Sequence, residues 1–543
     1  MPIETRLTKE LIDEYTNKGY WGKISFLDHL GKNIEKYPDK EALVDKKKRL
    51  TFKQWGLLVH RLALGFLELG IKEGDNVIIQ TPNWVEFPVI LFALGKIGAV
   101  TVPVGIYLRE RELDYILRFT EAKTVIIPSE FKGFDHYGMV RGLRSKLPVE
   151  TVLIMGDEMM NGTISIKEMM ENRLEEKYPE DYLDKYKPRG NDIFFLLFTS
   201  GTEADPKGTL ITHNNSLFSS QYPPFTEKDV AFPLIPLTTA LGMHMGFFVP
   251  FLKGAKIVLL DIFQPREALN IMVKERVTVP TGVPAQFIAI LSLPDIDRYQ
   301  LPPGNHIATS GAPCPSEVIR KLREKLGFKI LNYYGSSEVS LCTFNRLDDP
   351  VDVLAETIGR HPEGYQIKIV DDEGRELPKG ERGEIMVKSP SLFAGYYKDP
   401  GRTKQAFDEE GWYHTGDLGI LREDGNLCIA GRKKDVIIRG GRNISPVEVE
   451  DLLHSHPKIQ QAAMVGMPDE RLGEKNCIYV VPKSGEKVTL EELIDFLKER
   501  KIAAYKLPER LEIRNNLPIT PAGKIRKNEL KADIAKNLGI GVK

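Results

Sequence analysis

Hydrophobic and polar positions along the first part of the chain alternate between a helical period and short apolar runs. Apolar side chains recur every three or four residues in Phe52–Leu69, which predicts a helix that ends at Gly70. A short apolar run follows, and the same alternation is then repeated twice. The expected elements are strands Asn76–Gln80, Val100–Val104 and Thr124–Pro128 and helices Glu86–Gly95 and Glu110–Phe119. This rhythm predicts an α/β fold with parallel sheets and helices on both faces.

The rhythm resumes after a charged connection at about Asn161–Arg189. The expected strands are Lys256–Leu260, Val277–Pro280, His306–Thr309 and Lys329–Tyr333, and the expected helices are Pro265–Glu275, Pro284–Leu291 and Ser316–Leu326. After Gly364 the sequence pattern changes and predicts short strands joined by Asp- and Gly-containing turns. We expect a small β-rich subdomain there, with strands at Gln366–Val370, Gly383–Lys388 and Leu427–Ala430.

The last hundred or so residues read as a separate α+β unit. Amphipathic helices are expected at Pro446–His454 and Thr489–Lys501, and strands at Ile459–Val465 and Lys475–Val481. The charged segment Gly431–Asp435, which a glycine opens, joins this unit to the rest. Composition alone allows that segment to be either a hinge or a rigid turn.

Composition narrows the class of protein. The net charge is −1, with 75 Lys and Arg against 76 Asp and Glu, so nothing indicates nucleic acid or a membrane surface as a partner. The four cysteines are far apart and lack metal-ligand spacing, which favours free thiols in a reducing compartment. We find no apolar signal-peptide core and no integral membrane segment, and therefore expect a cytoplasmic protein.

A polar loop follows the apolar strand Asp192–Leu197. Its residues Phe198–Gly208 include three hydroxyls, two glycines and one lysine. Hydroxyl and backbone N–H groups donate to phosphate oxygens, glycine permits close approach, and Lys207 supplies a positive charge. The order of residues is not that of a Walker loop, because Lys207 precedes Gly208. The alternative, an ordinary surface loop, stays open on these residues alone.

Three later segments have the residue types of a nucleotide site. Thr309–Pro313 and Tyr333–Glu338 each end an expected strand, where ligands of open α/β sheets bind. In the second, an aromatic ring can stack on a base and a carboxylate can hold Mg²⁺. Trp412–Asp417 sets an acid after a tight turn, where it can accept from ribose hydroxyls or merely cap the turn. Leu517–Lys524 presents one lysine on a Gly/Pro loop. Taken singly, each is more often structural.

The ordered set of these motifs resembles the adenylate-forming (AMP-binding) superfamily. The set runs from the Phe198–Gly208 loop through Ser310–Pro313, Tyr334–Glu338, Trp412–Asp417 and Gly431–Asp435 to Pro518–Lys524. That superfamily contains acyl-CoA synthetases, aryl-acid and amino-acid adenylation domains, and beetle luciferases. The resemblance covers about Phe26 to Arg526.

The resemblance implies a fold and a reaction. A large N-terminal domain, residues 1–433, would contain two α/β sheets and a distorted β-barrel. A small mobile C-terminal lid, residues 434–543, would turn about a hinge near Lys434. The enzyme would be an acid–thiol ligase: it would join a carboxylate to the α-phosphate of ATP, release pyrophosphate, and then form a thioester with coenzyme A as AMP leaves. Alignment and charge neutralisation would drive both steps without a protein nucleophile.

The resemblance also assigns roles to residues. Lys524, Glu338 and Ser337 would be catalytic, with Glu338 holding Mg²⁺ and Ser337 touching the α-phosphate. Lys524 would bridge the carboxylate and the α-phosphate in the first step only. Gly440 and Gly441 would line the path of the pantetheine arm. The ATP- and AMP-binding residues would be Thr199, Ser200, Gly201, Thr202, Lys207, Gly311, Ala312, Pro313, Tyr334, Gly335, Ser337, Asp417, Arg432 and Lys524.

The identity of the acid is less constrained. Phe232–Ile235 lacks the acid that would hold an amino-acid ammonium group and the asparagine of dihydroxybenzoate-activating enzymes. The apolar segment Gly242–Phe248 would suit a flexible hydrophobic pocket, or simple core packing. We expect an apolar acid, medium- or long-chain fatty, with alicyclic and aromatic acids also open, and hence a place in fatty-acid and lipid metabolism. The pair Glu203–Ala204 departs from the usual phosphate loop.

Two alternatives and the oligomeric state stay open. One alternative is an aryl-acid adenylating enzyme that loads a carrier protein. The other is a nucleotide-binding regulator without catalysis, which the retention of Lys524, Glu338 and Asp417 disfavours. A homodimer is compatible with the resemblance but is not indicated by any residue.

Overall fold

The fold is built on two eight-stranded sheets. The computed structural model describes residues 3–157, 160–198, 207–301, 304–311, 314, 316–440, 442–520 and 524–538, with only the backbone of 316 and 317. The first sheet has the order β17 (Ser340–Phe344), β16 (Lys329–Ser336), β15 (His306–Thr309), β14 (Val279–Gly282), β12 (Val230–Pro233), β13 (Lys256–Val258), β1 (Glu41–Val44) and β2 (Arg49–Thr51). Its strands are parallel except at the two edges, where β17 and β2 run antiparallel.

The second sheet contains most of the strands expected in the first half of the chain. Its order is β20 (Gly395–Tyr396), β11 (Gly208–Thr212), β10 (Ile193–Phe198), β4 (Val100–Gly105), β3 (Asn76–Thr81), β5 (Thr124–Pro128), β8 (Thr151–Met155) and β9 (Ile164–Ser165). The strands from β10 to β9 are parallel, and β11 and β20 add an antiparallel edge. The predicted parallel α/β sheets are therefore confirmed.

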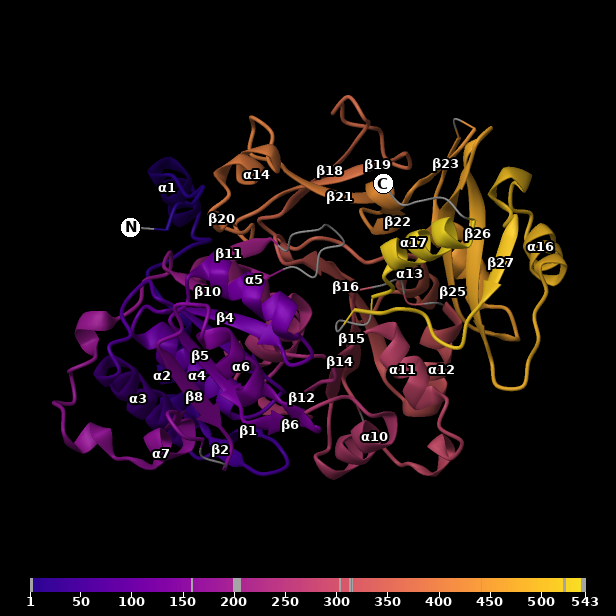
Figure 1. Cartoon of the computed structure of the whole chain (residues 1–543). Coiled ribbons are helices and arrows are strands. Elements are labelled where there is room, and N and C mark those ends of the chain that lie inside the picture. The colour runs from indigo at the N-terminus through magenta and orange to yellow at the C-terminus, as the bar shows by residue number, and fades with distance from the viewer. Residues whose placement is uncertain are drawn as a thin grey trace.

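Helices cover both sheets (Figure 1). In the N-terminal part they are α1 (Lys9–Asn17), α2 (Phe26–Lys36), α3 (Phe52–Glu68), α4 (Glu86–Lys96), α5 (Glu110–Thr120), α6 (His136–Arg144), α7 (Ile166–Glu171) and α8 (His213–Ser220). A π-helix, η3 (Gly242–Phe248), runs directly into α9 (Val249–Leu252). Then follow α10 (Pro265–Lys274), α11 (Pro284–Leu291), α12 (Ser316–Leu326), α13 (Val351–Glu356) and α14 (Pro400–Gln405).

The largest core cluster lies between the two sheets and is rich in aromatic rings. Trp55 of α3 and Phe92 of α4 have ring centroids 5.0 Å apart, and Phe251 of α9 lies 5.0 Å from Phe92. Offset and edge-to-face ring pairs of this kind add to the free energy of simple burial. Smaller clusters lie on the outer faces, under α5 and α6 on the second sheet and under α10 to α12 on the first.

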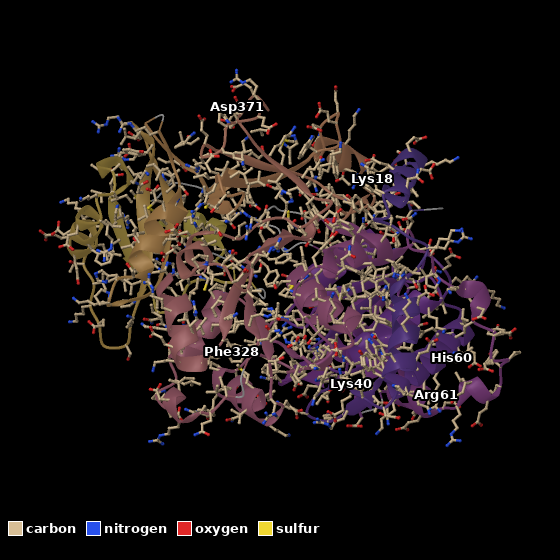
Figure 2. All side chains as sticks on the ribbon, turned by 180° about the vertical axis from the view of Figure 1, so that it is seen from behind. Lys18, Lys40, His60, Arg61, Phe328 and Asp371 are labelled. Carbon is tan, nitrogen blue, oxygen red and sulfur yellow. The ribbon has the colours of Figure 1, made fainter. Side chains whose placement is uncertain are left out.

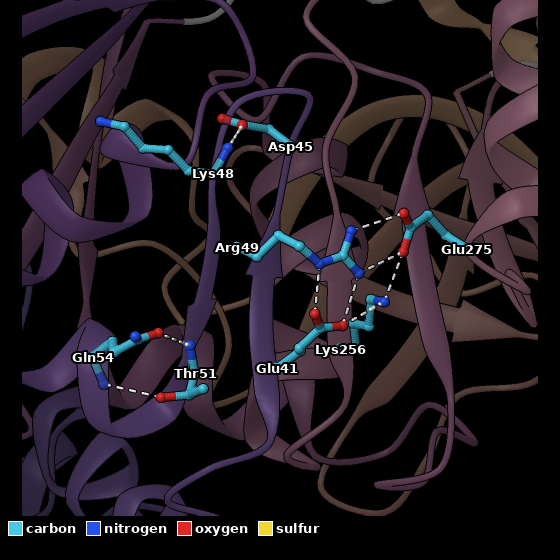
Figure 3. Close-up of polar contacts among 8 residues, drawn as sticks. All are labelled: Glu41, Asp45, Lys48, Arg49, Thr51, Gln54, Lys256 and Glu275. Carbon is cyan, nitrogen blue, oxygen red and sulfur yellow. Dashed lines mark hydrogen bonds and ion pairs between the residues drawn. The ribbon is translucent and has the colours of Figure 1, made fainter.

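Local sequence signals explain where elements begin. Thr51 starts α3 with a capping box: its Oγ1 accepts from the Gln54 N–H at 3.2 Å, and its own N–H donates to Gln54 Oε1 at 2.9 Å (Figure 3). The predicted strand at Val277–Pro280 begins later, at Val279. Arg276 has φ +55°, and Val277 still donates to Met272 O of α10, so the chain is turning there.

An ion-pair network links the strands at one edge of the first sheet to the end of α10. Arg49 of β2 contacts Glu41 of β1 at 2.5 Å and Glu275, at the end of α10, at 3.0 Å (Figure 3). Lys256 of β13 contacts the same two carboxylates at 2.8 and 2.7 Å. Hydrogen bonding to Arg49 lowers the pKa of both Glu41 and Glu275 to about 2. The network therefore ties β1 and β2 to β13 and the end of α10, which are distant from them in sequence.

The expected β-rich subdomain is a four-stranded antiparallel sheet of β18 (Gln366–Val370), β19 (Arg382–Lys388), β21 (Tyr413–Leu421) and β22 (Leu427–Arg432). The resemblance also implied a distorted barrel in the N-terminal domain. Within the part of the chain that the structure describes, none of the sheets closes on itself, so no closed barrel is found there.

The C-terminal part forms its own sheet, which lies beyond β22 (Figure 1). Its order is β24 (Arg442–Ile444), β23 (Ile437–Arg439), β26 (Gly473–Pro482) and β25 (Ile459–Asp469), with β27 (Arg510–Ile513) beside β26. Helices α15 (Pro446–His454), α16 (Leu490–Glu499) and α17 (Lys527–Asn537) accompany it. The expected α+β character is present, while the boundary between 433 and 434 stays a prediction. Among the described residues, no helix has the length and apolarity needed to cross a bilayer.

Candidate active site

Tyr334, Asp417 and Arg432 meet where β16, β21 and β22 come together. The Tyr334 hydroxyl donates to Asp417 Oδ2 at 2.8 Å, and Arg432 Nε lies 2.9 Å from Asp417 Oδ1. Asp417 and Arg432 are also direct cross-strand partners. Burial, together with the charge of Asp417, raises the pKa of Tyr334 well above its ordinary value, so the hydroxyl stays a donor. The Asp417 side chain is 11% exposed, and its carboxylate is held in one orientation from two sides.

Glu338 lies at the start of the turn between β16 and β17. Its two carboxylate oxygens accept from the Ser336 hydroxyl at 3.0 Å and from the Tyr396 hydroxyl at 3.1 Å. Tyr396 belongs to β20, which pairs with β11 at the base of the predicted phosphate loop. Lys207, at the end of that loop, has its Nζ 5.4 Å from the centroid of the Tyr396 ring. Glu338 and Lys207 therefore both lie next to Tyr396.

Lys524 reaches this region from the C-terminal unit. A Cβ on Gly311, just after β15, would lie 3.7 Å from Lys524 Cε, so the lysine stem runs along Gly311. The loop is held locally: the Lys524 N–H donates to Thr520 Oγ1 at 3.1 Å, and Thr520 N–H donates to Lys524 O at 2.7 Å. Burial and the neighbouring Arg432 guanidinium hold the pKa of the Lys524 amine below its ordinary value, whereas Asp417 and Glu338 oppose that shift.

Two glycines of the site are required by their backbone surroundings. Gly311 has φ +86°, which an L side chain rarely adopts. A Cβ on Gly335 would lie 1.8 Å from Ser340 O, because β16 and β17 come together at a bulge there. Gly335 therefore has a steric reason to be glycine, whether or not a nucleotide contacts it. Ser337, the first residue after β16, is half-buried.

The predicted hinge Lys434 lies in the short 3₁₀ turn Lys433–Asp435, between β22 and β23. Its carbonyl oxygen accepts from Lys531 Nζ at 3.5 Å, and the preceding Lys433 pairs with Asp372 at 3.0 Å. Gly440 has φ +57° in the turn of the hairpin from β23 to β24, and its N–H donates to Leu472 O of the same unit at 2.7 Å. The described contacts of Gly440 are thus made within the C-terminal unit, and those of Lys524 reach Gly311, just after β15.

Some predicted residues lie outside the described part of the chain. They are Thr199, Ser200, Gly201, Thr202, Ala312, Pro313 and Gly441, together with the pair Glu203–Ala204. Tyr396, in contrast, is a site residue that motif reasoning did not single out. Its signal was the Gly-Tyr-Tyr run after Phe393–Ala394, which resembles a short edge strand.

A hollow with a volume of about 500 Å³ lies elsewhere and shares no residue with this site. It is lined by Tyr37, Lys40, Glu41, Asp229 and Lys256, among others. Figure 2 labels Lys40 at the bottom of the molecule and Asp371, in the turn after β18, at the top. Because none of the predicted site residues lines it, and its Glu41 and Lys256 pair within the network of Figure 3, we do not regard this hollow as the reaction centre.

Comparison with known proteins agrees with this arrangement. The AMP-binding enzyme family matches residues 30–397, and the AMP-binding enzyme C-terminal domain matches residues 448–524. A medium-chain fatty-acid–CoA ligase of Escherichia coli (strain K12) is 37% identical over 96% of this chain and 93% of its own. A 2,3-dihydroxybenzoate-AMP ligase of Bacillus subtilis (strain 168) is 31% identical over 98% of each chain.

A solved structure has the same fold. The anthranilate CoA ligase AuaEII, in complex with anthranoyl-AMP, superposes with a TM-score of 0.87 at 26% identity, over 95% of this chain and 98% of that one. Both family domains, the two relatives and this structure span nearly the whole sequence in a single order. The chain therefore belongs to the AMP-binding enzyme family.

Proposed function

We propose that this protein is an AMP-forming acyl-CoA ligase that activates an apolar carboxylic acid. The observation that carries the proposal is the position of Lys524, which the C-terminal unit presents beside Gly311 at the carboxyl end of β15. Ligands of open α/β sheets bind at that edge. An ammonium group there can contact two anions that must approach each other, a carboxylate and a phosphate.

In the first step, a carboxylate oxygen attacks the α-phosphorus of ATP, the bond to the pyrophosphate oxygen breaks, and pyrophosphate leaves. Lys524 would donate to both the attacking carboxylate and an α-phosphate oxygen, which lowers their mutual repulsion. The pKa of its amine is lowered in the free site. The phosphates would raise it again, since an opposite charge favours the protonated form. No protein nucleophile is needed, because alignment and charge neutralisation supply the acceleration.

The nucleotide would be held by the groups around Asp417. That carboxylate still has lone pairs after it has accepted from Tyr334 and Arg432, and these would accept the ribose hydroxyls. The Tyr334 ring would stack on adenine, with Gly311, Ala312, Pro313 and Gly335 beside it. Ser337 would contact the α-phosphate, and Lys207, with residues 199–202, would hold the phosphates that leave.

Glu338 is suited to hold Mg²⁺ together with the ATP phosphates. Its oxygens each accept one hydrogen bond and keep further lone pairs, and protein Mg²⁺ sites commonly use one or two carboxylates plus substrate phosphates. Among the described residues no group of three or more His, Cys, Asp or Glu side chains could hold a metal by itself, which fits a site completed by substrate. The ion would neutralise charge on the departing pyrophosphate.

In the second step, the thiolate sulfur of coenzyme A attacks the acyl carbonyl carbon, the bond to the AMP oxygen breaks, and a thioester forms. Rotation near Lys434 would withdraw Lys524 and bring the Gly440–Gly441 turn to the site. One active site would then serve two transition states in turn. Domains 1–433 and 434–543 would be the two rigid parts of this motion.

The proposed acid is a medium- or long-chain fatty acid, with alicyclic and aromatic acids as further candidates. The E. coli relative, a medium-chain fatty-acid–CoA ligase at 37% identity, supports fatty acids and a role in lipid metabolism. The 2,3-dihydroxybenzoate-AMP ligase and the anthranilate CoA ligase keep the aryl class open. An enzyme that passes an aryl-AMP to a carrier protein is thus the second candidate.

A panel of fatty, alicyclic and aromatic acids, scored for AMP release with and without coenzyme A, tests the proposal. An acyl-CoA ligase releases AMP only when both an acid and coenzyme A are present, and it exchanges labelled pyrophosphate into ATP with the acid alone. Exchange without coenzyme A-dependent AMP release would favour carrier loading. Absence of exchange with every acid of the panel would favour the non-catalytic regulator. The cytoplasmic location and the homodimer stay predictions, and sedimentation would test the latter.

A further inference from the structure

The π-helix η3 packs on strands of the first sheet, whose carboxyl edge carries the proposed reaction centre. It packs against β12, β14 and β17 of the first sheet and against α8. The carboxyl end of β14 is next to that of β15. The chain after β15 continues to Gly311, beside which Lys524 lies. All side chains of η3 are buried, and π-helices are rare and often occur at functional sites. An acid whose carboxylate lies at Lys524 would therefore have η3 as a neighbour of its remaining part.

His244, in the middle of η3, is a buried imidazole with neither ring nitrogen hydrogen-bonded. The side chain is 1% exposed, and among the described residues no group pairs with Nδ1 or Nε2. Desolvation lowers the pKa of His244 to about 3, so the ring is neutral and offers one donor and one acceptor. A buried polar group left without a partner is costly. Purely apolar packing would be served better by leucine or phenylalanine at this position.

The neighbours of His244 place it on the side of the phosphate loop. Its ring centroid lies 6.2 Å from that of Phe195 in β10 and 5.7 Å from that of Phe248. Phe195 is three residues before Phe198, where the loop begins, which is roughly 10 Å along a strand. His244 therefore lies beside the strand from which the proposed phosphate loop departs. An N–H to ring contact with Phe248 would be a weak substitute for a hydrogen bond.

Other buried hydroxyls near η3 also lack partners. Thr281 of β14 shares the face of Val279, which belongs to the core between the two sheets, where η3 packs. Thr281 Oγ1 and the Ser216 and Ser220 hydroxyls of α8 have no hydrogen-bond partner among the described residues. Helix α8 packs directly on η3. The elements that pack on η3 thus carry more unpaired polar groups than a site for a plain hydrocarbon chain requires.

We propose that His244 is a specificity-determining residue that hydrogen-bonds a hydroxyl group on the acid substrate, so that hydroxylated acids are preferred to their unsubstituted parents. The inference rests on the proposed function. A neutral imidazole can accept from, or donate to, one hydroxyl without a change in charge. A site built to hydrogen-bond a substrate hydroxyl rejects the analogue that lacks it, because its own polar group is then left unpaired.

Matched acid pairs test this. We would measure kcat/KM for coenzyme A-dependent AMP release with benzoate against its monohydroxylated isomers, and with octanoate against chain-hydroxylated octanoates. The wild-type protein should prefer at least one hydroxylated acid to its parent by about tenfold or more. In His244→Leu the preference should fall to about threefold or less, mainly through loss of the hydroxylated acid.

Two variants serve as controls. His244→Gln keeps a donor and an acceptor and should retain most of the preference, and Met245→Leu, a volume-conserving change in the same π-helix, should retain all of it. Should His244→Leu fail to fold by circular dichroism, His244→Met replaces it, because methionine adapts to irregular space.

The outcomes separate this inference from the proposed function. If parent and hydroxylated acids are used equally by the wild-type protein, or if His244→Leu keeps the preference, the inference is overturned while the ligase activity stands. A water bound at His244 would give that result. If no acid supports AMP release, the proposed function itself fails, and with it the basis of this inference.

Discussion

At the scale of single residues, a change at Lys524 should impair the first half-reaction and spare the second. Lys524→Ala should lower acid-dependent pyrophosphate exchange by about a hundredfold or more, because a charge that stabilises the transition state is lost. Thioester formation from supplied acyl-AMP should be nearly unchanged. Lys498→Ala, an exposed lysine of α16, is the matched control. Equal loss of both half-reactions in Lys524→Ala would contradict the proposal that Lys524 is withdrawn before the second step.

The lowered pKa of Lys524 predicts a pH dependence of the same step. Burial and Arg432 favour the neutral amine, so in the free enzyme Lys524 loses its proton at a pH below the ordinary lysine value of 10.5. The kcat/KM of the first half-reaction should fall as pH rises through this lowered pKa, since kcat/KM reports the free enzyme. The second half-reaction, followed from supplied acyl-AMP, should show no such decline.

Tyr334 acts on the nucleotide through Asp417 as well as through its ring. Tyr334→Phe removes the 2.8 Å hydrogen bond to Asp417 Oδ2 and keeps the aromatic face. The KM for ATP should rise by about tenfold, as expected for a hydrogen bond to a buried charge, with a smaller change in kcat. Tyr333→Phe, on the same strand but 3.5 Å from His306 Nε2 instead, should leave the KM for ATP unchanged. Similar effects in both variants would argue against the Asp417 contact.

At the scale of elements, the ion-pair network of Figure 3 holds β1, β2, β13 and the end of α10. Arg49→Met should destabilise this edge by about 1–2 kcal/mol at neutral pH, a value discounted for solvent screening because Arg49 and Glu41 are 45% and 39% exposed. Thermal unfolding measures the change. Arg173→Met, whose pair with Glu176 is 71% and 63% exposed, should have almost no effect.

The same network should lose its contribution in acid. The folded pKa values of Glu41 and Glu275, about 2, lie below the ordinary 4.5, so the unfolded chain binds more protons in that window. The contribution is complete above pH 4.5 and is lost as pH falls toward about 2. The difference in unfolding temperature between wild type and Arg49→Met should therefore shrink in this range. A constant difference would mean that Arg49 acts by packing alone.

At the scale of the whole molecule, the position of Lys524 beside Gly311 corresponds to the arrangement proposed for the first half-reaction. Gly441→Leu should therefore retain pyrophosphate exchange and lose at least about tenfold in thioester formation, if the pantetheine arm passes this residue in the second arrangement. Lys524→Ala is the reciprocal control. An intact second step in Gly441→Leu would mean that the pantetheine path lies elsewhere. Gly441 itself lies outside the described residues.

Much of the fold followed from local patterns. The periodicity of Phe52–Leu69 predicted α3, and Pro284–Leu291 and Ser316–Leu326 are helices with the expected bounds. Val279 shows the limit, because the left-handed turn at Arg276 delays the strand. The π-helix was not predicted. Its seven residues are apolar apart from His244, and apolar runs contain no periodicity that distinguishes π from α.

The order of motifs along the chain, by itself, determined the family and named Tyr334, Glu338, Asp417, Arg432 and Lys524, because each motif is local in sequence. The sequence could not tell which of these side chains meet. The Tyr334–Asp417 and Tyr396–Glu338 contacts join residues far apart in the chain, and only the packing of β16, β20 and β21 decided them. Tertiary structure alone also left both nitrogens of His244 unpaired in the core, since burial depends on which elements pack around a residue.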